Sequence, residues 1–159
     1  FNPKAQCGID GRLLNPKLSK LLKKARLINP RIAWDGPYTQ WKSIKAQIDM
    51  LADAGYKPKD IYVFMIYNYD LDYYEMKKKL GRCKKWGVQI ADCRFRPLDQ
   101  TFDNYNPRRK QTIADYHIHP NWTDRQVKLF RRSVREQNIV IRHGFSFYSR
   151  ELERLGGGK

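Results

Sequence analysis

Short apolar runs recur along the first part of the chain, and each is followed by a turn and a helical pattern. The runs cover residues 6–10, 31–35, 61–67 and 88–92. Their spacing is roughly that of a strand–helix–strand unit, about 30 residues. Because such connections are right-handed, successive units build a parallel sheet or a partial barrel. The unbroken run 61–67 is typical of a strand buried on both faces of a parallel sheet. The predicted fold class is therefore α/β.

Local end signals delimit the helices between these runs. Asn15 and Pro16 form a helix start, with Asn as the N-cap and Pro at the first helical position. The helix after the third run is expected to take Asp70 as its N-cap and to stop at Gly87. A capping box at residues 123–126 predicts the start of the last helix.

The pattern divides the chain into four parts. Residues 1–95 carry the βα units, and residues 96–122 are rich in Pro, Asn, Asp and aromatic side chains. We expect this second part to be a long irregular connection, and loops of such length are often functional. We expect residues 123–155 to form a C-terminal helical segment and residues 156–159 to be a frayed tail.

The net charge is the strongest signal in the composition. The chain carries 32 Lys and Arg against 16 Asp and Glu, which gives +16. A charge of this size attracts polyanions, including nucleic acids. A lineage whose proteins are generally basic would explain the charge equally well, so both interpretations stay open.

Cysteine usage and hydropathy bear on the compartment. Cys7, Cys83 and Cys93 show no regular spacing, unlike the disulfide framework of a small secreted domain. A reducing compartment such as the cytoplasm is therefore expected. No run approaches the roughly 20 apolar residues that span a bilayer, so no membrane partner is expected.

Polar residues stand where the predicted strands end. They are Asp10, Asp35, Asn68 and Asp92. The carboxyl ends of parallel strands carry the ligand sites of α/β sheets and barrels. These residues are therefore candidates for ligand contacts. The alternative for Asp10 and Asp35 is helix capping, or an ion pair with Arg12 or Arg31.

Two short motifs carry a family resemblance. Residues 8–14 are Gly-Ile-Asp-Gly-Arg-Leu-Leu, and residues 31–35 are Arg-Ile-Ala-Trp-Asp. These motifs resemble the fourth-strand and fifth-strand segments of radical S-adenosylmethionine (radical SAM) proteins, and residues 60–70 are similar to the sixth strand. The resemblance covers about residues 6–95 and, more loosely, the region of Trp122.

The resemblance implies a partial (βα)6, TIM-like barrel that holds a [4Fe–4S] cluster and S-adenosylmethionine. The family's cluster ligands lie in a CxxxCxxC motif, which this sequence lacks, and such a cluster needs thiolate ligands. The resemblance therefore implies about half of the barrel, its C-terminal part. Asp10, Asp35 and Asn68 would contact S-adenosylmethionine or substrate, and the chain would not be catalytic on its own.

The same resemblance raises the question of the other half of the barrel. The cluster-binding N-terminal half would be on another chain, cut away or lost. A half barrel exposes sheet edges that invite pairing, so a second copy of this chain is the other expected partner. A non-catalytic scaffold domain that pairs with a partner chain is an alternative function.

Basic clusters support a further alternative, a basic α/β module that binds nucleic acid. Two clusters lie in the connection and in the last helix, and they comprise Arg108, Arg109, Lys110, Arg131, Arg132 and Arg135. Tyr105 and Tyr116 flank the first of them, and cations with stacking aromatics are what nucleic-acid binding uses. A third cluster, at 77–79 with 82, 84 and 85, spreads around a helix and is expected to be mostly a solvated face.

Metal ligands and nucleophiles are sparse. His117 and His119 lie on one side of an extended segment, but no third ligand is evident, so hydrogen-bonded or exposed imidazoles are expected. Cys83 is expected to be a buried structural thiol. Cys93 follows a strand and has no identifiable catalytic partner.

Overall fold

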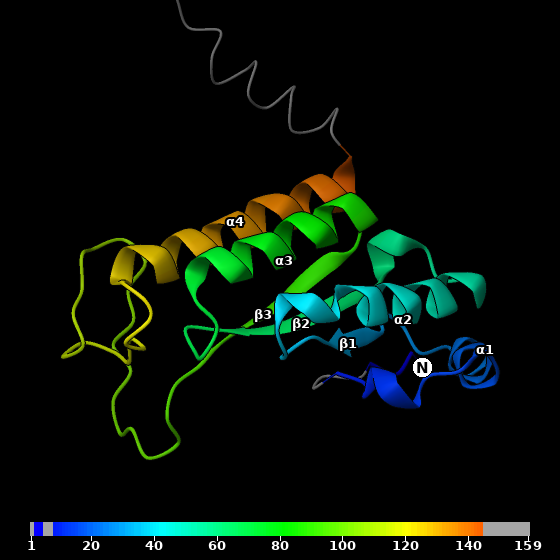
Figure 1. The fold of residues 1–159 in the computed structure, drawn as a ribbon, viewed down its shortest axis with the longest axis horizontal. Coiled ribbons are helices and arrows are strands. Elements are labelled where there is room, and N and C mark those ends of the chain that lie inside the picture. Colours follow the sequence, from blue (N-terminus) through cyan, green and yellow to red (C-terminus); the bar gives the residue numbers. More distant parts are fainter. Residues whose placement is uncertain (1, 5–7, 145–159) are drawn as a thin grey trace, which may run out of the picture.

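A parallel β-sheet forms the centre of the molecule. The computed structural model describes residues 2–4 and 8–144. Among these, the strands β1 (Arg31–Ala33), β2 (Tyr62–Tyr67) and β3 (Gln89–Arg94) pair in the order β1-β2-β3, all parallel (Figure 1). A parallel bridge between Ile9 and Ile32 extends the sheet beyond β1. The predicted α/β class with a parallel sheet is confirmed, although the first predicted strand is reduced to this bridge in the described residues.

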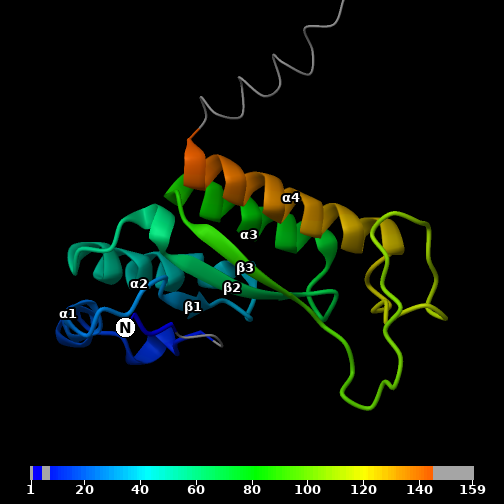
Figure 2. The same ribbon diagram turned by 180° about the vertical axis from the view of Figure 1, so that it is seen from behind.

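The sheet is accompanied by four α-helices and by short 3-10 turns. The helices are α1 (Pro16–Lys24), α2 (Trp41–Asp53), α3 (Tyr73–Trp86) and α4 (Asp124–His143), and the turns are η1 (Gly11–Leu13), η2 (Tyr38–Gln40) and η3 (Pro58–Asp60). Figure 2 shows α3 and α4 running side by side along β3. The rest of the predicted C-terminal segment, and its tail, lie outside the described residues.

The helix ends agree with the local signals in all but one place. The side chain of Asn15 accepts from the backbone of Leu18 at 2.8 Å, and Gly87 ends α3 in the left-handed region. Thr123 and Gln126 form the predicted capping box. Asp70 as the N-cap of α3 was wrong, because Asp72 fills that position. The segment offers two acids two residues apart, and the helix starts after the second.

The two faces of the sheet differ in burial. Ile32, Val63 and Ile90 lie in register and are fully buried beneath the helices. On the opposite face, residues such as Phe64 and Ala91 are only half-buried. The prediction that the third run is buried on both faces was therefore wrong. Its buried residues alternate, because helices cover one face and leave the other partly open.

Helix α4 closes the outer edge of β3. The side-chain amide of Asn138 accepts from the backbone N–H of Ile90 and donates to the carbonyl of Ile90, each at 2.8 Å. These are the groups with which an edge strand would recruit another strand. Asn138 therefore occupies the backbone groups of Ile90 that a further strand beside β3 would use.

Residues 96–122 contain no helix or strand, as predicted. Ion pairs and hydrogen bonds to other parts of the fold hold this loop in place. Arg94 forms an ion pair with Asp103 at 2.6 Å. The buried Trp122 donates its indole N–H to the carbonyl of Leu71 at 2.8 Å. In the described part of the chain, no helix combines the length and apolar character that crossing a bilayer demands.

Candidate functional site

A cavity of about 580 Å³ lies at the ends of the first strands. It is bounded by the segment after Ile9, the end of β1, the turn η2 and the first half of α2. Asp10 and Asp35 both line it, as expected for residues that follow neighbouring parallel strands. The other side chains that offer polar atoms come from Arg12, Gln40, Ser43 and Gln47.

Asp10 combines a structural role with its place in the cavity wall. Its carboxylate caps η1 by accepting from the backbone N–H of Arg12, and it pairs with the guanidinium of Arg12 at 2.7 Å. These hydrogen bonds lower the pKa of Asp10 to about 2. The predicted alternative of capping and an Arg12 ion pair is therefore confirmed, and the carboxylate still borders the cavity.

Asp35 is the less compensated of the two carboxylates. Within the described chain it takes part in no ion pair. Partial burial raises its pKa, and the positive charge of Lys79 opposes that rise. Asp35 also remains accessible to solvent at the mouth of the cavity. A ligand with a positive charge or several donors would stabilise this carboxylate.

Gln47 adds an acceptor that the sequence patterns did not single out. It lies in the middle of α2 and is buried, and its Oε1 has no hydrogen-bond partner among the described residues. Gly11 makes room for it, since a Cβ at that position would lie 1.6 Å from this oxygen. A buried acceptor without a partner costs free energy unless a ligand or water donates to it.

The cavity therefore gathers oxygen acceptors. Asp10, Asp35 and Gln47 suit a ligand that presents hydroxyl, amino or cationic groups, such as a nucleoside with its ribose diol.

Asn68, the third predicted contact, serves the fold instead. Its side chain is fully buried, donates to the carbonyl of His117 at 2.9 Å and accepts from the N–H of His119 at 2.9 Å. Its backbone adopts φ +60°, which Asn tolerates better than most residues. Every polar atom of this amide is used by loop backbone, so Asn68 fixes the loop and does not line the cavity. Asp92 lies inside β3 rather than at its end.

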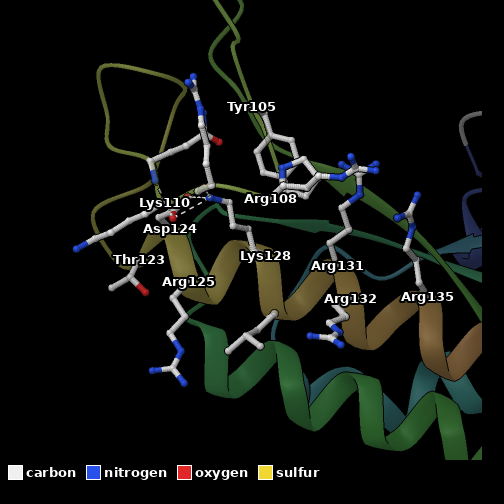
Figure 3. Close-up of a pocket in the computed structure, with 14 residues that line it drawn as sticks. Tyr105, Arg108, Lys110, Thr123, Asp124, Arg125, Lys128, Arg131, Arg132 and Arg135 are labelled. Atoms are coloured by element: carbon white, nitrogen blue, oxygen red, sulfur yellow. Dashed lines mark hydrogen bonds and ion pairs between the residues drawn. The ribbon is translucent and has the colours of Figure 1, made fainter. Parts of the chain in front are cut away.

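A second hollow, which we call the basic groove, lies between the loop and α4. It has a volume of about 820 Å³, and eight of its lining residues are cationic (Figure 3). All six residues predicted for nucleic-acid binding line it, together with Arg125 and Lys128. Figure 3 shows Arg131 and Arg135 pointing from α4 toward the loop side, and Arg125 and Arg132 pointing the other way. The basic groove joins clusters that are separated in the sequence.

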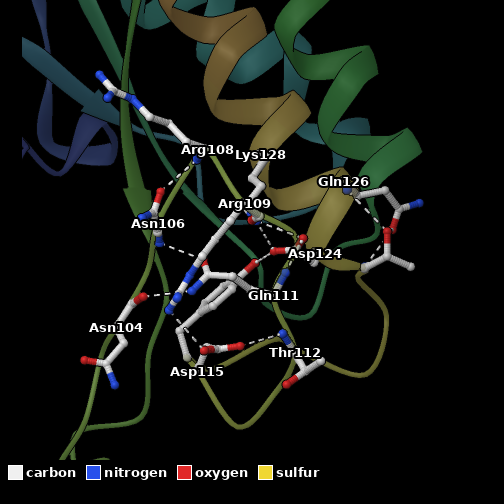
Figure 4. A network of polar contacts seen from close by, with 12 residues as sticks. Asn104, Asn106, Arg108, Arg109, Gln111, Thr112, Asp115, Asp124, Gln126 and Lys128 are labelled. Carbon is white, nitrogen blue, oxygen red and sulfur yellow. Dashed lines mark hydrogen bonds and ion pairs between the residues drawn. The ribbon is translucent and has the colours of Figure 1, made fainter.

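One carboxylate organises the floor of the basic groove (Figure 4). Asp124 pairs with Lys128 at 2.6 Å and accepts from the Tyr116 hydroxyl at 2.8 Å and from the N–H of Gln111 at 3.1 Å. Burial alone would raise the pKa of Asp124, but these bonds hold it below its usual value. Lys128 also donates to the carbonyl of Arg109, which ties the loop to α4.

The aromatic residues of the loop do not act as predicted. Tyr116 is fully buried, so it cannot stack on a base. The ring of Tyr105 carries the guanidinium groups of Arg94 and Arg131, at 4.6 and 5.5 Å from its centroid. Cation–π contacts of this kind restrain Arg131 at the edge of the basic groove. Tyr105 therefore positions cations, and the buried Tyr116 offers no stacking face.

The basic cluster on α3 divides in two. Lys79 is fully buried, and its Nζ donates to the carbonyl of Trp34 at 2.9 Å. Arg82 lies over the ring of Trp41 at 4.1 Å. The remaining lysines of the cluster are exposed, so the expectation of a solvated face is confirmed for these alone.

The described residues contain no group of three His, Cys, Asp or Glu side chains that could hold a metal ion. His119 accepts from the N–H of Asn121 and lies 4.0 Å from Asp70. Cys83 is fully buried, and burial raises the pKa of its thiol, so it is the structural thiol that was expected. Cys93 is exposed, and Cys7 lies outside the described residues.

Comparisons with known proteins identify no family for this chain. No protein-family model matches the chain, and searches of curated proteins and of solved structures find no match.

Proposed function

We propose that this chain is the C-terminal part of a radical SAM enzyme and supplies the wall that binds S-adenosylmethionine or substrate. The observation that carries the proposal is the placement of Asp10 and Asp35 in one cavity at the strand ends. Each of them belongs to one of the two motifs that resemble the family. The unpartnered Oε1 of Gln47 adds a third acceptor in the same cavity.

The chain's own part in this function is to bind and orient. The two carboxylates attract a cationic ligand, and Gln47 accepts from one of its donors. Bound S-adenosylmethionine supplies the radical chemistry of such enzymes only together with a reduced cluster. The described residues do not fit that cluster, since Cys83 is buried in α3, Cys93 lies on β3, and no group of three ligating side chains gathers around either. We therefore assign no step at the cluster to this chain.

The sheet also favours a partial barrel that needs a second half. The helices cover one face, as they cover the outside of a βα barrel, and the inner face is half-buried. Since Asn138 occupies the edge of β3, a cluster-binding half would pair beside Ile9. A second copy of the chain that pairs through β3 is disfavoured for the same reason. The proposal includes a cytoplasmic location, where the free thiols Cys83 and Cys93 persist.

Equilibrium dialysis with labelled S-adenosylmethionine tests this function. The wild-type chain should bind saturably, and Asp35→Ala should weaken binding by about tenfold or more, the value of a lost hydrogen bond to a charged group. Asp53→Ala is the matched control, because it removes an exposed carboxylate at the other end of α2. Absence of saturable binding, or equal binding by Asp35→Ala and the wild type, would contradict the proposal.

A further inference from the structure

We infer that the basic groove binds the phosphate backbone of a nucleic acid. This site is separate from the acceptor-lined cavity and shares no residue with it. It is formed by residues 105–111 of the loop and by the first three turns of α4.

The charge of the basic groove is largely uncompensated. Asp124 is the one carboxylate among the described residues that line it, and Lys128 already pairs with Asp124. Arg109 and Arg132 have acidic partners at 3.4 and 3.1 Å. The other five cations, Arg108, Lys110, Arg125, Arg131 and Arg135, form no ion pair with any described acid. Mutual repulsion among these cations is relieved when a polyanion binds.

The spacing of the cations fits a chain of phosphates better than a single one. On the loop side of α4, Arg131 and Arg135 are four residues apart, about 6 Å along the helix axis at 1.5 Å per residue. One strand of a duplex places a phosphate about every 3.4 Å along its axis, so these two arginines can face neighbouring phosphates. Arg108 and Lys110 supply a second row from the loop. A single small anion would leave most of these cations unpaired.

The chemistry of the lining favours phosphate over a lipid surface or an acidic protein. Six of the eight cations are arginines, whose planar forks match phosphate oxygens in pairs. A membrane-binding surface needs apolar side chains beside its cations. The aliphatic residues of the lining are Pro107 and Leu129, of which Leu129 is half-buried, and the exposed Leu98 and Ile113 of the loop are not among the lining residues. Because the tyrosines are occupied, binding should depend on the backbone and show little sequence preference.

Fluorescence anisotropy with labelled 20-mers, as single strands and as duplexes, tests the inference. The triple variant Arg108→Gln, Lys110→Gln, Arg135→Gln removes three exposed cations that form no ion pair with any described acid. We expect it to lose at least tenfold in affinity at moderate salt. The slope of log K against log salt should fall by about 2 to 3, because each phosphate contact contributes about 0.7 to 0.9.

The matched control is Lys78→Gln, Lys84→Gln, Lys85→Gln, which removes the same charge from the exposed side of α3. Both triple variants are checked by circular dichroism, and the control should retain binding within threefold. Equal losses in both variants would overturn the groove as the site. Binding that does not depend on salt, or equal affinity for polyglutamate or for vesicles of phosphatidylserine and phosphatidylcholine, would overturn the nucleic acid as its ligand.

Discussion

At the scale of single residues, the sequence predicts positions that follow from topology but not those that depend on distant contacts. The neighbourhood of Asp10 and Asp35 follows from topology, because parallel strand ends meet at one edge. The role of Asn68 does not, since its partners His117 and His119 lie about 50 residues away. The place of Gln47 in the cavity could not be predicted either, because the direction of its side chain depends on the packing of α2 beside Gly11. Polar side chains that are fixed by tertiary contacts carry no periodic signal in the sequence.

Lys79 makes a testable contribution to the pH dependence of stability. Burial lowers its pKa from 10.5 to about 8, while Glu75 and Asp35 oppose this. Between these values the unfolded chain binds more protons than the folded one, so the unfolding free energy rises with pH. Relative to the wild type, Lys79→Met should lose this rise, which is roughly 3 kcal/mol. Urea unfolding at pH 8 and at pH 10.5 measures the difference.

The exposed neighbour provides the control for this measurement. Lys78→Met should track the wild type at both pH values, because Lys78 is exposed. A constant stability difference between Lys79→Met and the wild type across this window would show that Lys79 is not a desolvated base.

At the scale of elements, the predictions succeeded where the signals are local. Asn15, Gly87 and Thr123 act within one helical turn, so their roles can be read from a few neighbouring residues. The burial of β2 on one face only could not be predicted, because it depends on how many helices cover the sheet. The same holds for the contact of α4 with β3, which joins residues 48 positions apart.

The hydrogen bonds between α4 and the edge of β3 can be tested with Asn138→Ala. This variant leaves the N–H and the carbonyl of Ile90 without their partners, at an expected cost of about 1 to 3 kcal/mol in unfolding free energy. Hydrogen exchange at the amide of Ile90 should accelerate as well. Glu136→Ala on the same helix breaks only an exposed ion pair and should cost less than about 0.5 kcal/mol. Equal stability of the two variants would show that Asn138 does not protect the edge.

At the scale of the whole molecule, two surfaces of opposite charge are formed by segments that follow the carboxyl ends of the strands. The cavity follows Ile9 and β1 and is lined with acceptors, and the loop of the basic groove follows β3. Part of the net charge of +16 is thus gathered at one site rather than spread evenly. Composition could indicate the charge, but only the fold brings the cations of the loop and of α4 together.

The most direct test of the proposed function is a site-resolved one. In an amide NMR titration with S-adenosylmethionine, the signals of Gly11, Gly36, Ser43 and Gln47 around the cavity should shift and saturate together. The basic groove should not respond, because the ligand shares its positive charge. Shifts confined to the basic groove, or no saturable shift in the cavity, would contradict the assignment of this chain to S-adenosylmethionine or substrate binding.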